Sequence, residues 1–175
     1  MNLQLKRCTK EDIPLLATIS ERTFRDAFED QNNPDDFEQH IKSAFSLNTI
    51  RKEVLNEHAA FYFVKDKDEV LGFFKVNNYG AQTDIHDEQS LELERIYILS
   101  DYQGRGIGSW IMEQVISMAR AAGKSYIWLG VWEANIKAIR FYEKLGFATF
   151  GKHPFYIGQD KQMDWLMRLQ LPFKN

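Results

Sequence analysis

Glycines at positions 104, 106 and 108 separate a strand-like segment from the most regular helical pattern in the chain. Before them, residues 91–98 alternate as the residues of a strand do. After them, apolar residues recur at helical spacing as far as Gly123, a helix-ending residue. The stripe comprises Ile107, Trp110, Ile111, Val115, Met118 and Ala122. A buried strand is predicted at 126–131, and because a helix connects the two strands, they should lie parallel in one sheet.

The glycine turn has the chemistry of an anion site. Glycine permits positive φ angles and a close backbone approach, so successive N–H groups can converge on one anion. The N-terminus of the following helix adds unsatisfied donors and the positive end of its dipole. Arg105 adds a full charge nearby. The segment therefore indicates a pyrophosphate cradle, although three glycines also suit a tight turn without a ligand.

Two other phosphate-binding patterns do not fit this turn. The dinucleotide fingerprint G-x-G-x-x-G requires glycine at position 109, where this chain has Ser109. A P-loop would end in Gly-Lys-Ser or Gly-Lys-Thr, and neither tripeptide occurs in the sequence.

The rest of the chain adds helices first and strands later. A short strand is predicted near residues 3–5, and Thr9 with Asp12 forms a capping-box pattern that opens the first helix. Further helices are predicted at 37–45, 50–55 and 135–145, and further strands at 59–64, 70–76, 147–150 and 165–171. Residues 77–89 are polar and read as a loop. This order predicts an α+β fold around a mixed sheet.

Composition limits the class of protein. The 175 residues fit one domain, predicted to span 1–175, and 44% of them are hydrophobic, which excludes a disordered chain. The net charge is −3 without a basic block, so neither direct nucleic-acid binding nor membrane binding is expected. Cys8 is the single cysteine, which agrees with a reducing, cytoplasmic location. The four histidines are scattered and form no zinc motif, so no metal is expected.

Two motifs in the second half of the chain resemble those of the GCN5-related N-acetyltransferase (GNAT) family. Gln103, Gly106 and Gly108 match the family pattern Gln/Arg-x-x-Gly-x-Gly/Ala between a strand and a helix. The segment 135–147 matches Asn-x-x-Ala-x-x-Phe-Tyr-x-x-x-Gly-Phe. The resemblance implies a mixed, mostly antiparallel sheet of about seven strands with helices on both faces. It also implies that the fourth and fifth strands are parallel and splayed apart.

The resemblance further implies acetyl-CoA as the acetyl donor and CoA as a product. In the family, the donor lies between the splayed strands, with its pantetheine amides paired to the fourth strand and its pyrophosphate on the glycine turn. The residues implied here as cofactor-binding are Ile96, Tyr97, Ile98, Gln103, Gly104, Arg105, Gly106, Ile107, Gly108, Ser109 and Asn135.

Direct transfer to an amine needs a proton acceptor and a proton donor. An alkyl amine has a pKa near 10, so removing its proton at pH 7 costs roughly 4 kcal/mol. By resemblance, Tyr142 is the general acid that protonates the departing sulfur, and Glu94 is the favoured general base. Glu92 has the same strand parity, but a bulge is expected in this strand, so parity does not decide between the two. Either glutamate can also be a solvated strand carboxylate.

The sequence around Glu94, Ser100, Asp101 and the glycine turn resembles the spermidine/spermine (diamine) N-acetyltransferases, and residues 127–133 and 153–163 resemble bacterial Pai-type enzymes. A small polycationic amine is therefore the expected substrate partner. Carboxylates and aromatic rings would bind its ammonium and methylene groups. The candidates are Glu92, Trp132, Glu133, Tyr156 and Asp30.

Other acceptors and roles stay open at this point. The rival acceptors are a protein N-terminus, a lysine or another small amine. A different class is an acyl-CoA-binding regulatory module. A homodimer through the C-terminal strand is an alternative to ordinary core packing for its aromatic residues.

Overall fold

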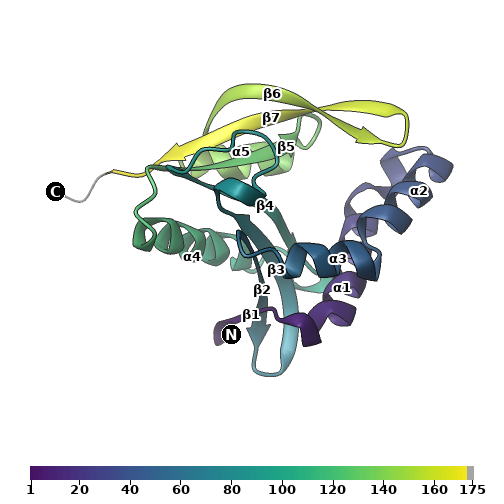
Figure 1. The fold of residues 1–175 in the computed structure, drawn as a ribbon, viewed down its shortest axis with the longest axis horizontal. Helices are drawn as coiled ribbons and strands as arrows, with labels where there is room; N and C mark the ends of the chain where they lie inside the picture. Colours follow the sequence, from purple (N-terminus) through teal and green to yellow (C-terminus); the bar gives the residue numbers. More distant parts are fainter. Residues whose placement is uncertain (173–175) are drawn as a thin grey trace.

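The computed structural model describes residues 1–172, which form a seven-stranded sheet in the order β1-β2-β3-β4-β5-β7-β6 (Figure 1). Neighbouring strands are antiparallel except β4 and β5, which are parallel. The strands are β1 (Leu3–Arg7), β2 (Ala59–Asp66), β3 (Glu69–Asn77), β4 (Ser90–Ile98), β5 (Tyr126–Trp132), β6 (Ala148–Ile157) and β7 (Asp160–Gln170).

Five helices cover the two faces of the sheet: α1 (Ile13–Phe28), α2 (Pro34–Ala44), α3 (Leu47–Val54), α4 (Ile107–Ala121) and α5 (Ile136–Lys144). The first three pack on one face, where Leu16, Phe37 and Ile50 join Phe63 and Phe73 in one hydrophobic cluster. The last two contribute to the second cluster, on the opposite face (Figure 1). The predicted α+β class, the mixed sheet and the parallel pair are confirmed.

Side chains at the helix ends explain where several helices begin. Asp12 Oδ2 accepts a hydrogen bond from Thr9 N at 2.9 Å, as the capping-box pattern predicted. The first turn is a 3-10 helix, Lys10–Asp12, which continues into α1. Asn33 accepts hydrogen bonds from two backbone N–H groups of α2, and Pro34 occupies the first helical position.

The parallel pair is joined over a short length only. Ser90, Leu91 and Glu92 pair with Tyr126, Ile127 and Trp128, and no later pairing joins the two strands within residues 1–172. On its other edge, β4 stays paired with β3 as far as Ile98. The two strands therefore separate after Glu92, as the resemblance implied.

The C-terminal hairpin is longer than the sequence pattern predicted. Strands were expected at 147–150 and 165–171, whereas β6 and β7 extend to a turn at Gly158, whose φ is +59°. The added part has few buried apolar residues, so alternation gave a weak signal there. The tip of the hairpin reaches α2 (Figure 1), and Gln162 Nε2 donates to Asn32 Oδ1 at 2.8 Å.

The predicted apolar stripe of α4 is partly wrong. Ile107, Ile111 and Val115 are buried as expected, but Met112 and Ala119 complete the buried face. Trp110 and Met118 are half-buried, and Ala122 is exposed beyond the last turn. Within residues 1–172, none of the helices has the length and apolarity needed to span a bilayer.

Candidate active site

A cavity of about 350 Å³ lies between α1, α2 and the strands β4 to β7. Its walls combine aromatic rings with ionisable side chains. The rings include Phe24, Phe28, Tyr97, Trp132, Tyr142 and Phe155. The ionisable side chains include His40, Glu92, Glu94, Arg95, His153 and Asp164.

One wall of the cavity is the β4 edge that β5 leaves unpaired. Ile96 and Tyr97 line it, and their main chains are paired only with β3 within the described part of the chain. Ile98 continues this edge, and its carbonyl oxygen accepts a hydrogen bond from Gln103 Nε2 at 3.0 Å. A free strand edge can bind an extended ligand through main-chain hydrogen bonds.

The glycine turn follows this edge directly. Gly104 and Gly106 have φ angles of +74° and +78°, and a Cβ at either position would meet no atom within 4 Å. Gly106 is the N-cap of α4, so the first N–H groups of that helix, which have no partners within the helix, lie at this turn. The turn has the conformation and access that an anion cradle needs.

The remaining predicted cofactor residues lie in different environments on the turn and on α4. Ile107 is buried in the core, and Ser109 is exposed on α4. A Cβ at Gly108 would lie at an ordinary contact distance, 3.4 Å, from the Phe141 ring, so this face of α4 packs against α5. Arg105 is exposed and stacks on a neighbouring tyrosine, Tyr102.

Asn135 lies at the start of α5, where its Oδ1 accepts a hydrogen bond from Ala138 N at 3.2 Å. It also lines the cavity. Its side chain therefore has a capping role whether or not it touches a ligand.

Glu94 is the extra residue of a β-bulge, since Lys75 pairs with Arg95 while Val76 pairs with Leu93. Its carboxylate lies 2.5 Å from Lys75 Nζ and 3.2 Å from Arg95 Nη2. Burial raises the pKa of Glu94, but Arg95 and Lys75 outweigh that effect and lower the pKa overall. Glu94 is therefore held as a carboxylate and is a weak proton acceptor.

Glu92 has a different environment on the same strand. It is 2% exposed and accepts hydrogen bonds from the Thr83 N–H and hydroxyl at 2.9 and 2.5 Å, and from Asn77 Nδ2 at 3.0 Å. Burial raises its pKa, and the charge of Glu94 adds to the rise. Asn77 Nδ2 also donates to Glu94 at 2.7 Å, so one amide group joins the two carboxylates.

Tyr142 lies on α5 and lines the same cavity as the β4 residues. Burial raises the pKa of its hydroxyl, with a smaller contribution from Tyr97. The hydroxyl makes no hydrogen bond to any of residues 1–172. Tyr142 therefore keeps its proton at neutral pH and presents it at the cavity, which is what a general acid requires.

The predicted substrate-binding residues divide into two groups. Glu92 and Trp132 line the cavity. Asp30, Glu133 and Tyr156 are exposed and do not line it. Asp30 follows α1 in a 3-10 turn, whereas Tyr156 points away from the cavity side of β6, where its neighbour Phe155 lies instead.

Several polar residues of the cavity were not predicted from the sequence, among them His40, Arg95, His153 and Asp164. His153 and Asp164 face each other across the β6–β7 pair. The alternating pattern could have found them only with the full length of β6, since the predicted strand ended at residue 150.

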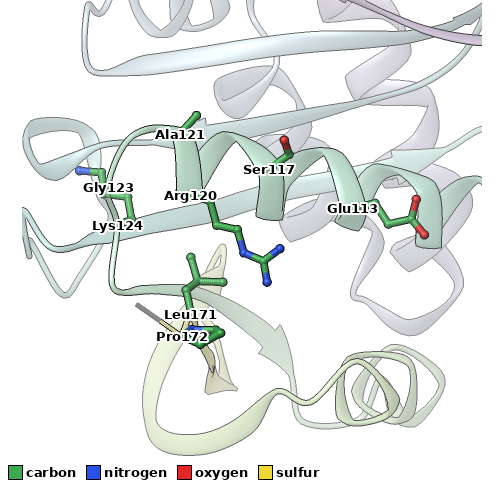
Figure 2. A pocket seen from close by; sticks show the side chains of 8 residues that line it. All are labelled: Glu113, Ser117, Arg120, Ala121, Gly123, Lys124, Leu171 and Pro172. Atoms are coloured by element: carbon green, nitrogen blue, oxygen red, sulfur yellow. The ribbon is translucent and has the colours of Figure 1, made fainter. Parts of the chain in front are cut away.

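A second cavity, of about 530 Å³, lies at the other end of α4 (Figure 2). Glu113, Ser117 and Arg120 line it from the helix, and Leu171 and Pro172 line it from the end of the described chain. A helix of this length spans roughly 22 Å, so this cavity is remote from the glycine turn at the helix N-terminus. It takes no part in the site described above.

Comparison with known proteins points to one family. Residues 16–147 match the sequence model of the Acetyltransferase (GNAT) family. An uncharacterised N-acetyltransferase of Lactobacillus delbrueckii subsp. lactis is 34% identical over 169 residues, which cover 97% of this chain and 98% of that protein.

Two solved structures have the same fold. One is the PaiA N-acetyltransferase of Thermoplasma acidophilum in complex with coenzyme A, with a TM-score of 0.77, 17% identity and coverage of 98% of this chain and 100% of that one. The other is the spermidine N-acetyltransferase of Vibrio cholerae in complex with CoA and spermine, with a TM-score of 0.70, 18% identity and coverage of 96% and 95%.

Proposed function

Because the chain belongs to the Acetyltransferase (GNAT) family, we propose that it transfers an acetyl group to a primary amine of a polyamine such as spermidine or spermine. The coarser activity, acetyl-CoA-dependent N-acetyl transfer, follows from family membership. The choice of a polyamine rests on the side chains of the cavity.

Acetyl-CoA, when bound, supplies the thioester carbonyl that the amine attacks and the thiolate that departs. The residues of this chain fit such a donor. The unpaired edge at Ile96 and Tyr97 can pair with amides of an extended chain, and the open turn at Gly104 and Gly106 can approach a pyrophosphate.

The observation that carries the proposal is the combination of carboxylates and aromatic rings in one cavity. Glu92 and Asp164 line it without an ion pair to lysine or arginine within residues 1–172, whereas Glu94 is paired with two cations. Phe28 and Trp132 lie edge to face, with centroids 6.2 Å apart. A polyamine has ammonium groups for the carboxylates and methylene groups for the rings.

Two further roles belong to this proposal. Tyr142 is the general acid, because it lines the cavity and burial raises the pKa of its hydroxyl, which keeps its proton. Glu94 as general base stays a prediction, and its two cationic partners weigh against it.

The test is CoA-thiol release by the purified protein with spermidine, spermine, single amino acids and peptides with free N-termini. We expect kcat/KM to be highest for the polyamines. Turnover of peptides without turnover of spermidine would overturn the polyamine assignment. Binding of acetyl-CoA without turnover of any amine would instead favour a regulatory module.

A matched variant sharpens the assignment. Glu92→Gln removes one carboxylate of the cavity at constant size, and a simple alkyl monoamine offers only one ammonium group. We expect the variant to reduce kcat/KM for spermidine more than for the monoamine. Equal losses for both acceptors would contradict a role of Glu92 in binding a distal ammonium group.

A further inference from the structure

Three side chains from neighbouring strands form a row along one wall of the cavity. Trp132 of β5 pairs with Asp164 of β7, and Asp164 pairs with His153 of β6. Directly opposed residues of neighbouring strands project to the same face of a sheet. All three line the cavity. An imidazole and a carboxylate are therefore fixed in the acceptor cavity, outside the motifs that the family shares.

His153 is oriented by a carboxylate on each side. Its Nδ1 lies 3.1 Å from Asp84 Oδ2, and its Nε2 lies 3.8 Å from Asp164 Oδ2. When Nδ1–H donates to Asp84, Nε2 is left with a lone pair that can accept a proton. The side chain of His153 is itself 25% exposed, so a proton accepted on the imidazole can pass to solvent.

Asp84 is held in place by its own loop. The preceding residue, Thr83, donates two hydrogen bonds to Glu92 of β4. In the loop between β3 and β4, Thr83 therefore contacts β4 through Glu92, and the next residue, Asp84, contacts β6 through His153. The hydrogen bonds of Thr83 to Glu92 therefore fix the part of the loop that places Asp84 beside His153.

Asp164 is the carboxylate of this wall that is free to bind a cation. Its side chain is 17% exposed, and His153 is its one ion-pair partner among residues 1–172. Burial raises its pKa, an effect that His153 offsets only in part. A Cβ at Gly130 would lie 3.4 Å from Asp164 Oδ2, so the glycine leaves room above β5 beside the carboxylate.

We propose that His153 removes the proton from the acceptor ammonium, which Asp164 binds, while Asp84 positions the imidazole. In this step an N–H bond of the ammonium breaks, its electron pair stays on nitrogen, and the proton binds to Nε2 of His153. The imidazolium lies between two carboxylates, and Nε2 later gives this proton to solvent, which restores the tautomer whose Nδ1–H donates to Asp84. With acetyl-CoA bound, the neutral amine would attack the thioester carbonyl as the C–S bond breaks. Tyr142 would give its proton to the departing sulfur, and its phenolate would take up the second proton that the nitrogen loses on becoming an amide.

The two glutamates of β4 are poorer acceptors for this proton. Glu94 is stabilised as the anion by Lys75 and Arg95, and both oxygens of Glu92 already accept hydrogen bonds. Imidazole is also the side chain whose ordinary pKa suits general base chemistry near neutral pH.

The inference rests on acetyl transfer to an amine, whichever amine is preferred. The test is the pH profile of kcat/KM for the best acceptor, measured for wild type, His153→Asn and Glu94→Gln. A general base contributes about 100-fold or more, so we expect His153→Asn to lower kcat/KM about 100-fold at pH 7. The loss should shrink as the pH approaches 10, where the amine is neutral without help. The dissociation constant of acetyl-CoA should not change.

His58→Asn is the matched control, since this half-exposed histidine lies outside the cavity, and it should keep wild-type activity. Asp84→Asn provides a second variant if His153→Asn does not fold. It should produce a smaller loss with the same recovery at high pH, as a positioning residue would.

The inference is overturned if His153→Asn stays within twofold of wild type, or if its loss is equal at every pH. It is also overturned if Glu94→Gln alone shows the loss that recovers at high pH. Activity of the wild type with peptides but not polyamines would overturn the polyamine proposal and leave the His153 result readable on the peptide. Absence of turnover with every amine would overturn both.

Discussion

Lys75 Nζ lies 2.5 Å from Glu94 Oε2, and both side chains are largely buried beside the cavity. Arg95 joins this pair, and Glu53 of α3 completes the network with two hydrogen bonds from Arg95 at 2.7 and 2.9 Å. The network has two cations and two carboxylates, so it is neutral overall. Its position at the β4 bulge indicates that it stabilises the point where β4 leaves β5.

Removing Lys75 should destabilise the fold. Breaking a buried ion pair by deleting one partner costs about 3 kcal/mol, because the other charge is left without compensation. We expect Lys75→Met to lower the free energy of unfolding by about this amount, measured by urea denaturation. The double variant Lys75→Met with Glu94→Gln should recover more than half of the loss. Additive losses would show that the two residues are not coupled.

Glu94 and Glu92 should have opposite effects on the pH dependence of stability. Folding lowers the pKa of Glu94, so its contribution is present above the ordinary value of about 4.3 and is lost as pH falls through the folded-state pKa. Folding raises the pKa of Glu92, so its contribution is present below about 4.3 and is lost as pH rises through the folded-state pKa.

Urea unfolding of the Glu94→Gln and Glu92→Gln variants between pH 3 and 8 checks these two opposite pH dependences of stability. The deficit of Glu94→Gln relative to wild type should be largest at neutral pH and shrink in acid. The free energy of unfolding of Glu92→Gln should increase relative to that of wild type as the pH rises above about 4.3. Glu88→Gln, an exposed position, controls for the substitution. If the stability of both variants relative to wild type changed in the same direction with pH, the two different environments of Glu92 and Glu94 would be contradicted.

The sequence predicted those parts of the fold that depend on local signals. The Thr9–Asp12 capping box placed the first helix, and Gly123, with a φ of +68°, placed the end of α4. Both signals act within a few residues, so they do not depend on the rest of the structure. The hairpin of β6 and β7 depends instead on contacts with β5 and α2, and its length was therefore not predictable from local alternation.

The candidate site was likewise predictable only where it depends on local sequence patterns. The glycine turn and Tyr142 lie in motifs whose spacing is fixed along the chain. The environment of Glu94 depends on a bulge opposite Lys75, and strand parity does not predict where a bulge turns a side chain. His153 and Asp84 are 69 residues apart and meet only through the packing of a loop against β6.

The positive φ of Gly106 provides a test of the cofactor cradle. An alanine there is strained by about 1 kcal/mol but meets no atom within 4 Å. We expect Gly106→Ala to weaken acetyl-CoA binding about tenfold or more, because a methyl group keeps the backbone from approaching the pyrophosphate. Isothermal titration calorimetry measures the change.

Gly123→Ala is the matched control for this test. Gly123 also has a positive φ and open space around it, but it lies at the opposite end of α4. It should lose similar stability and keep the acetyl-CoA affinity of wild type. Equal weakening of acetyl-CoA binding by both variants would show that strain, and not the cradle, causes the loss.

Tyr142→Phe should reduce catalysis without reducing stability. The hydroxyl makes no hydrogen bond to residues 1–172, so its removal leaves no partner unsatisfied. A general acid contributes about 100-fold, and we expect kcat to fall by about that factor while the free energy of unfolding stays within about 0.5 kcal/mol of wild type. Steady-state CoA release and urea unfolding measure the two quantities.

Tyr126→Phe should show the reverse pattern, which makes it the control for Tyr142→Phe. The Tyr126 hydroxyl donates to Asp87 Oδ2 at 2.6 Å, outside the cavity. Its removal should cost about 1 kcal/mol of stability and leave kcat unchanged. If Tyr142→Phe kept full kcat, another group would have to protonate the sulfur. If both variants lost kcat in proportion to their loss of stability, the loss in Tyr142→Phe would be explained by destabilisation. The hydroxyl of Tyr142 would then have no role as a proton donor.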